Sequence, residues 1–333
     1  MTEIAEVKPA YAYTAKEVNE RIRSLAINRK SNRGVGDCVK TGIEFFDKRN
    51  VPMTRGTIAT IVGQTNHGKS PLAATIAYNV KESLKKYESP GSVVVFLTEE
   101  TVEKREIQMW GDSRIGLRDI LLGNAKLDVI DDNIAKSNSD PVYFIGDTAD
   151  IASADMNDET LGAMTPHRIG ITLQKLVRMG VQPELVVIDH VHDLQLEKPP
   201  RDEGELYETI GRQLIALASA LKPYCPVLYV CQAKKEVGSR PAGIQRIPEV
   251  GDIKYMSSLI HKTSHCYSIS YPKKYMKDQM VKAGNGEFRA TTGLFIVSGA
   301  KLRDGDSGES CVMTTLDGDS RWTGLLKELK EEK

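Results

Sequence analysis

The chain has 333 residues, enough for one large domain or two smaller ones. Its 45 basic and 45 acidic residues cancel, which excludes binding of nucleic acid through overall positive charge, so any such surface has to be a local patch. The N-terminus lacks an apolar signal core and no apolar run is long enough to cross a bilayer, which predicts a cytoplasmic protein without a membrane partner. The five cysteines contain no C-x-x-C pair, so we interpret them as reduced thiols.

The N-terminal part of the chain is predicted to be a tail, a helix and a linker. Between Ala15 and Ile27 the apolar residues recur on one helical face, and Thr14 and Glu17 have the spacing of a capping box. The segment 28–40 is basic and contains glycine, as is typical of linkers. We therefore expect residues 1–40 to precede a single domain over 41–326, and residues 327–333 to form a charged tail.

The rest of the chain alternates apolar strands with helix-length segments, which predicts an α/β fold with a mostly parallel sheet flanked by helices. The predicted strands cover residues 57–63, 92–98, 142–145, 185–189, 226–231, 266–270, 294–301 and 310–315. The last three follow one another closely, which indicates an antiparallel C-terminal extension of the sheet. The long segment 237–251 directly follows a strand and is predicted to be a binding loop.

One eight-residue run fits the phosphate-loop pattern G-x-x-x-x-G-K-[S/T] without a mismatch. It consists of Gly63, Gln64, Thr65, Asn66, His67, Gly68, Lys69 and Ser70. A strand precedes it and a helix follows, so backbone N–H groups would point at the phosphates of ATP. Lys69 would neutralise the β- and γ-phosphates, and Ser70 would bind Mg²⁺. His67 either hydrogen-bonds phosphate or occupies a variable position, and we favour the second.

Three further strands end in polar residues. Asp189 follows Val-Val-Ile in the Walker B form, where its carboxylate would help Ser70 to hold Mg²⁺. Glu99 ends another apolar run and is predicted to be the base that orients the attacking water, with Glu100 as the competing candidate. Gln232 ends a third run, where an amide could sense the γ-phosphate.

Lys301 and Arg303 lie two residues apart near the end of the chain. On a strand such residues share a face and could reach one polyanion together. From the spacing alone, an exposed hairpin with solvated cations is the favoured interpretation.

Between Thr41 and Trp322 the sequence resembles the RecA-like motor domain of DnaB-type replicative hexameric helicases. The matching segments, in order, are Thr41 to Asp47 (T-G-x-x-x-L-D), Phe96 to Glu99 (F-S-L-E), Ile188 to Leu194 (I-D-Y-L-Q-L), Glu208 to Leu214 (E-I-x-x-I-S-R-x-L-K), Cys225 to Val227, Pro248 to Asp252, and Lys301 to Arg303 (K-x-R). The order and approximate spacing of these segments agree with the family.

The resemblance implies an ATP-dependent DNA helicase with a RecA-like P-loop ATPase core, which forms a ring, expected to be a hexamer, around single-stranded DNA. Lys69, Asp189, Glu99 and Gln232 would form the catalytic set, and the cations of K-x-R would reach the γ-phosphate held by the neighbouring subunit. The loops after the sensor strand would face the DNA through Lys234, Lys235, Arg240, Arg246 and Lys254. A loader or other replication proteins would be further partners, and the missing globular N-terminal domain suggests a plasmid, phage or other mobile-element helicase.

The sequence also departs from the family pattern. His190 and His192 replace the tyrosine and the glutamine that follow Walker B, and residues 260–265 replace an acidic stretch of the fourth motif. The two histidines and Asp193 could suggest zinc, but the Walker B context already explains the segment. Two alternatives therefore stay open: a RecA/KaiC-like DNA-associated ATPase that acts as a filament, loader or regulator without unwinding, and an assembly protein with little turnover.

Overall fold

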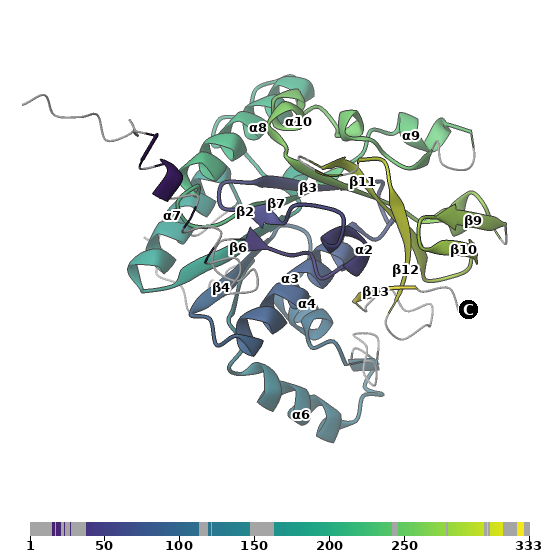
Figure 1. Ribbon diagram of the computed structural model, residues 1–333, viewed down its shortest axis with the longest axis horizontal. Helices are drawn as coiled ribbons and strands as arrows, with labels where there is room; N and C mark the ends of the chain where they lie inside the picture. Colours follow the sequence, from purple (N-terminus) through teal and green to yellow (C-terminus); the bar gives the residue numbers. More distant parts are fainter. Residues whose placement is uncertain are drawn as a thin grey trace, which may run out of the picture.

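The computed structural model describes residues 15, 16, 18–20, 23, 27, 38–112, 119–120, 122–146, 163–241, 246–277, 279–302, 305, 307–315 and 325–329 (Figure 1). None of the described helices is long and apolar enough to cross a membrane. All five cysteines are buried and free, as the sequence predicted.

A nine-stranded sheet forms the centre of the fold, in the order β13-β12-β11-β8-β3-β7-β6-β4-β5 (Figure 1). The six parallel strands are β8 (His265–Ser270), β3 (Ile58–Gly63), β7 (Val227–Gln232), β6 (Gln182–Asp189), β4 (Gly91–Leu97) and β5 (Val142–Gly146). The three antiparallel strands are β11 (Leu294–Leu302), β12 (Ser310–Thr315) and β13 (Leu326–Glu328). The predicted mostly parallel sheet with an antiparallel C-terminal extension is confirmed.

The central strands β3, β4 and β7 are buried on both faces of the sheet, which explains why they are nearly continuous apolar runs. Successive side chains of a strand point to opposite faces. On β4, Val93 and Val95 join one hydrophobic cluster, whereas Val94 and Phe96 join the other. Each cluster is completed by helices on its own side.

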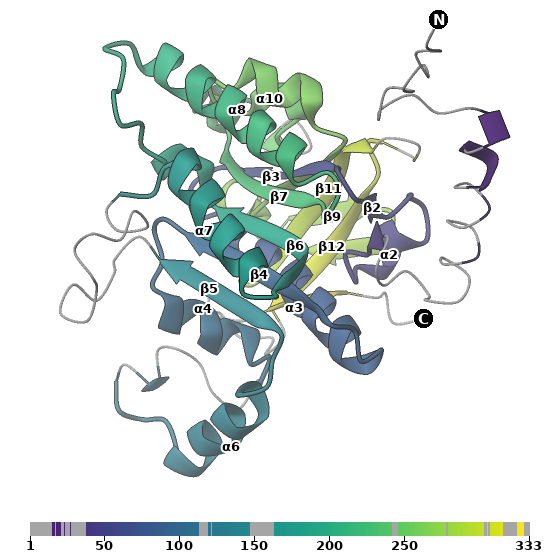
Figure 2. The same cartoon turned by 90° about the vertical axis from the view of Figure 1, so that its left-hand side faces the viewer.

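Helices cover the sheet from both sides (Figure 2). One face carries α3 (Lys69–Lys86) and α4 (Val102–Met109), and the other carries α7 (Pro166–Arg178), α8 (Glu203–Ala220) and α10 (Ser257–Lys262). The shorter elements are α2 (Glu44–Asp47), α6 (Leu127–Ser137), α9 (Glu236–Ser239), η1 (Val191–Asp193), η3 (Val250–Asp252) and η4 (Pro272–Lys274). Side-chain N-caps begin α4, α7 and α8, since Thr101, Thr165 and Asp202 each accept a hydrogen bond from the N–H three residues on.

Several short strands were not predicted. They are β1 (Cys38–Val39), β2 (Met53–Thr54), β9 (Met280–Ala283), β10 (Gly286–Arg289) and β13. β1 lies in the predicted linker and pairs with β2, and β13 extends into the predicted tail, where Glu328 accepts a hydrogen bond from the Phe45 N–H at 3.0 Å. The predicted loop 237–251 contains most of α9 and the start of η3. Between Ala15 and Ile27 the seven described residues are helical, and the rest of that predicted helix lies outside the described residues.

Candidate nucleotide site

The carboxyl ends of four parallel strands meet at one edge of the sheet. Strand pairing places Gly63 of β3 beside Gln232 of β7, and Leu97 of β4 beside Asp189 of β6. β6 and β7 are themselves neighbours. The predicted phosphate loop, acids and glutamine therefore follow the same edge, which is where open α/β sheets bind ligands.

The predicted phosphate loop joins the end of β3 to the first turn of α3. Gly68 has the left-handed φ of +87°, and a Cβ added to it would lie 2.7 Å from the Phe295 ring. A Cβ on Gly63 would lie 2.9 Å from Ile269 Cγ2. Glycine is therefore required at both positions. α3 has no side-chain N-cap, so its first N–H groups are suited to bind a phosphate.

Lys69 is buried at the start of α3, and its Nζ donates to the Gln64 carbonyl at 3.0 Å. Burial lowers the pKa of Lys69, and the carboxylates of Asp189 and Glu99 act against that shift. The loop thus contains a cation close to both predicted acids. This cation and the uncapped N–H groups at the start of α3 together suit the loop to a nucleotide phosphate.

His67 has a structural contact that its position in the motif does not reveal. The ring is buried, and Nδ1 accepts a hydrogen bond from the Tyr271 N–H at 3.2 Å. Burial lowers the pKa of His67 to about 4, so the ring is neutral. Lys274 also reaches the loop, since its Nζ donates to the Thr65 carbonyl at 3.2 Å. These contacts fasten the loop to the segment that follows β8.

The two adjacent glutamates after β4 have different surroundings. The Glu99 side chain is 69% exposed, whereas that of Glu100 is 15% exposed. Glu100 binds Lys104 at 2.5 Å and Arg105 at 2.8 Å, so its carboxylate is already engaged within the fold. Glu99 is therefore the glutamate with the access to water that a catalytic base needs.

Arg105 is a buried cation beside the Walker B position that sequence analysis missed. Its Nη2 lies 2.5 Å from Asp189 Oδ2 and 2.8 Å from Glu100 Oε2, and its Nη1 donates to the Ser70 carbonyl at 3.4 Å. Although burial disfavours the charge, both carboxylates raise the pKa of Arg105. The residue therefore links the phosphate loop, Walker B and the end of β4. Its place in the polar helix segment of α4 gives no sequence signal for this role.

Replacing Arg105 with leucine is expected to lower the free energy of unfolding by about 3–5 kcal/mol, because it removes the cation that is paired with the buried carboxylate of Asp189 and with Glu100. Urea denaturation measures the change. Arg212→Leu is the matched control: that side chain is 73% exposed and 3.8 Å from Glu208, so its loss should change stability by less than about 1 kcal/mol. Equal effects of the two substitutions would contradict the role of Arg105.

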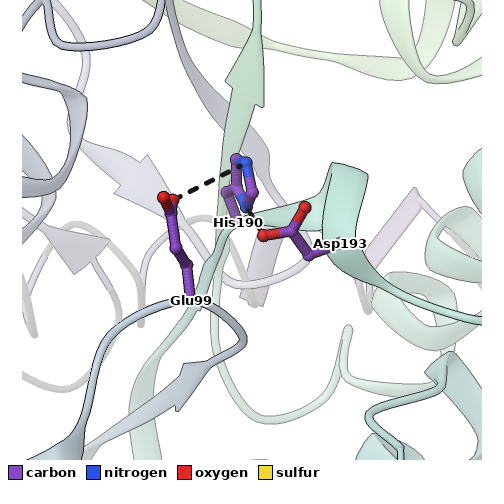
Figure 3. A group of neighbouring side chains, drawn as sticks. All are labelled: Glu99, His190 and Asp193. Atoms are coloured by element: carbon purple, nitrogen blue, oxygen red, sulfur yellow. Dashed lines mark ion pairs between the residues drawn. The ribbon is translucent and has the colours of Figure 1, made fainter.

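His190 lies between Glu99 and Asp193 (Figure 3) and also contacts the predicted sensor glutamine Gln232. Its Nδ1 lies 3.1 Å from Asp193 Oδ2, and its Nε2 lies 2.8 Å from Gln232 Nε2 and 4.0 Å from Glu99 Oε2. An amide nitrogen only donates, so Nε2 accepts and Nδ1 carries the proton toward Asp193. Glu99, His190 and Asp193 could together offer ligands to a metal. Both ring nitrogens of His190 are already in contact with a partner, Nε2 with Gln232 and Nδ1 with Asp193.

The predicted K-x-R pair lies on the antiparallel side of the sheet. Lys301 is on β11, and its Nζ donates to the Ile260 carbonyl at 3.4 Å. Among the described residues, its hydrogen bonds do not reach the phosphate loop or the acids of the same chain. Arg303 lies outside the described residues.

Most of the predicted DNA-facing cations are engaged within the chain. Arg240 binds Asp252 through two hydrogen bonds of 2.9 and 2.7 Å, and Arg246 donates to the Arg240 carbonyl. Lys254 binds Glu203 at 2.6 Å. Lys234 donates to the Gly251 carbonyl at 2.9 Å, and Lys235 is exposed next to it. Together these contacts hold the segment after β7 against η3 and α8.

The parallel sheet, the phosphate loop after β3 and the acids after β4 and β6 define a RecA-like P-loop ATPase fold. Residues 38–315 match the family described as the DnaB-like helicase C-terminal domain. The chain therefore belongs to this family of DnaB-like helicases.

Solved structures agree with this assignment at the level of the fold. A structure described as an ATPase domain is 15% identical, with a TM-score of 0.71 over 96% of this chain and 100% of that one. A DnaB-like replicative helicase, described with its interactions with primase, is 15% identical, with a TM-score of 0.69 over 94% of this chain and 67% of that one. No curated protein matches the sequence.

Proposed function

We propose that this protein is a ring-forming helicase motor that hydrolyses ATP and moves along single-stranded DNA. The proposal is based on one observation in a chain of the DnaB-like family. One edge of the sheet brings together the side chains of Lys69, Glu99, Asp189 and Gln232. Each of these side chains has a charge or hydrogen-bonding group suited to one part of phosphoryl transfer.

The nucleotide would be held by the loop from Gly63 to Ser70. Its backbone N–H groups and Lys69 would bind the phosphates, and Ser70 and Asp189 would hold Mg²⁺, which neutralises charge on the phosphates when bound. Arg105 keeps the Asp189 carboxylate fixed in place. Glu99 would orient and deprotonate the attacking water, and the amide of Gln232 would report whether the γ-phosphate is present.

Replacing Glu99 with glutamine should slow ATP hydrolysis by roughly 10²-fold or more and leave ATP binding intact, because the amide keeps the shape but accepts no proton. Steady-state turnover and nucleotide binding measure the two effects. Glu100→Gln is the matched control, which should lower thermal stability through Arg105 and Lys104 more than it lowers turnover. The reverse result would show that Glu100 is the base.

The ring would be assembled through the groove between α7 and α8. This groove has a volume of about 790 Å³, and its lining includes Pro166, Ile171 and Leu217. We assign it to the amphipathic segment Ala15–Ile27 of a neighbouring subunit, because the apolar side chains Val18 and Ile27 of that segment are 41% and 55% exposed in the single chain. Neighbouring subunits, expected to number six, would then share each nucleotide site through Lys301 and Arg303.

DNA would contact the segment after β7, where the five predicted cations gather. The alternative, a RecA/KaiC-like filament, loader or regulator that does not unwind, has one observation in its favour. Arg240 and Lys254 are paired with the carboxylates of Asp252 and Glu203, which reduces the net positive charge of this surface. A phosphate backbone would have to compete with these pairs.

Strand separation distinguishes the two functions. The full chain, with ATP and Mg²⁺, should release the labelled strand of a forked duplex, because a ring that moves along one strand displaces the other. Glu99→Gln protein should bind the fork without separating it, which serves as the control for passive melting. Hydrolysis that is stimulated by single-stranded DNA without strand release would instead support the filament, loader or regulator.

A further inference from the structure

His192 joins the predicted sensor strand to the turn that carries Lys254. The ring is buried on η1. Its Nδ1 lies 3.1 Å from the Gln232 N–H group, and its Nε2 lies 3.0 Å from the Lys254 carbonyl. A backbone N–H only donates and a carbonyl only accepts, so Nδ1 accepts and Nε2 carries the proton. Both nitrogens of a single neutral tautomer are therefore in use.

The imidazole ring of His192 belongs to a closed set of hydrogen bonds that includes Gln232 and Lys254. Besides its bond to His192, Gln232 accepts at its carbonyl from the Lys254 N–H at 3.0 Å, next to a bridge between Ala233 and Ile253. Burial lowers the pKa of His192 to about 4, so the imidazole stays neutral near pH 7 and acts as a fixed brace. Neither the end of β7 nor the Lys254 turn can shift without breaking a buried hydrogen bond to this ring.

Aromatic and cationic side chains lie at the Lys254 end of this brace. The His192 ring contacts Tyr207 at 5.1 Å between centroids, and Tyr207 lies parallel to Tyr255 at 6.2 Å. Lys254 Nζ lies 5.1 and 5.3 Å from the centroids of these two tyrosine rings. Tyr255 is 49% exposed. An exposed ring beside a lysine is suited to stack on a nucleobase, and a phosphate of the backbone would compete with the Glu203 carboxylate for Lys254.

The Gln232 end of this brace lies in the predicted ATP hydrolysis site. The side chain of Gln232, whose backbone N–H binds His192, meets His190 at 2.8 Å, and His190 lies 4.0 Å from Glu99. A γ-phosphate that moves the backbone of Gln232 would act on the His192 ring through the Gln232 N–H, and through the ring on the carbonyl of Lys254.

We propose that His192 is a positioning residue that couples the nucleotide state at Gln232 to the affinity of the Lys254–Tyr255 turn for single-stranded nucleic acid. The inference rests on the proposed function, because it requires both ligands to bind this chain. Coupling of this kind is reciprocal, so a bound nucleotide should change nucleic-acid affinity by the same factor by which the nucleic acid changes nucleotide affinity.

Two substitutions of His192 remove its two hydrogen bonds one at a time. His192→Asn places an oxygen where Nδ1 accepts from Gln232, but it has no group that reaches the Lys254 carbonyl. His192→Gln places an amide nitrogen where Nε2 donates to that carbonyl. Each substitution therefore keeps one hydrogen bond of the brace and removes the other. His261→Asn, at an exposed histidine on α10, is the matched control.

The test measures the dissociation constant of the full chain for a fluorescent oligothymidylate, with and without a non-hydrolysable ATP analogue and Mg²⁺. The wild-type protein and His261→Asn should show a ratio of the two constants on the order of tenfold. Both His192 variants should bring this ratio to within about twofold of one while nucleotide affinity alone is kept, because each variant retains only one of the two hydrogen bonds that connect Gln232 with Lys254.

Four outcomes would overturn the inference. One is an unchanged ratio in either His192 variant, and another is a nucleotide affinity that falls together with the ratio. If the wild-type protein binds the oligonucleotide equally well with and without the ATP analogue, only the coupling inference is overturned and the proposed function stands. A wild-type protein that binds no oligonucleotide in either state would overturn the proposed function along with it.

Discussion

Lys69→Ala protein is expected to fold normally and to hydrolyse no measurable ATP. Lys69 is the motif cation of the phosphate loop, and its Nζ binds the Gln64 carbonyl at a buried position where burial lowers its pKa. Its removal leaves the charge of the β- and γ-phosphates without that partner. Because a buried charge costs free energy in the folded chain, its loss should not reduce stability much.

Lys86→Ala is the matched control for this experiment. Lys86 lies at the other end of α3, where it is exposed and its Nζ is 5.5 Å from the ring centroid of Tyr87. Both variants should have the helical circular dichroism and melting temperature of the wild type, and only Lys69→Ala should lose turnover. Substantial residual hydrolysis in folded Lys69→Ala protein would show that the nucleotide is bound elsewhere.

Strands of the central sheet could be predicted where they are continuous runs of apolar residues that are buried on both faces. Val93 to Phe96 is such a run, and its alternate side chains enter the two hydrophobic clusters. β1 and β2 have only two residues each, so they contain no periodic pattern. β13 is charged at two of its three positions and depends on β12 for pairing.

The strand-end residues of the site could be predicted for a similar reason. Gly63, Asp189 and Gln232 directly end their strands, so topology alone brings them to one edge. Arg105 and His192 could not be predicted to contribute, because their partners are 84 and 40 positions away and only the folded chain brings them together. Long-range pairs of this kind are set by packing between elements, which a local pattern does not encode.

Arg303→Ala protein is expected to bind ATP and hydrolyse it at least on the order of 10³-fold more slowly than the wild type, the usual contribution of an arginine finger. The neighbouring residue Lys301 is on β11, where its described hydrogen bond is to Ile260 and not to the phosphate loop of its own chain. A finger that acts on the neighbouring subunit fits this placement. Lys301→Ala should show a related and milder defect, measured in the same turnover assay.

Mixing of subunits tests whether the site is shared. Arg303→Ala protein and Glu99→Gln protein should each be inactive alone, but a mixed ring contains interfaces with a wild-type Glu99 on one side and a wild-type Arg303 on the other. Partial recovery of hydrolysis is therefore expected on mixing, because only such interfaces hold both groups. The control combines Glu99→Gln with Lys69→Ala, two defects on the same side of the interface, and should recover nothing. If the two variants of the first mixture are shown to assemble together and no hydrolysis returns, Arg303 does not act across the interface. The ring motor then loses its main mechanistic support.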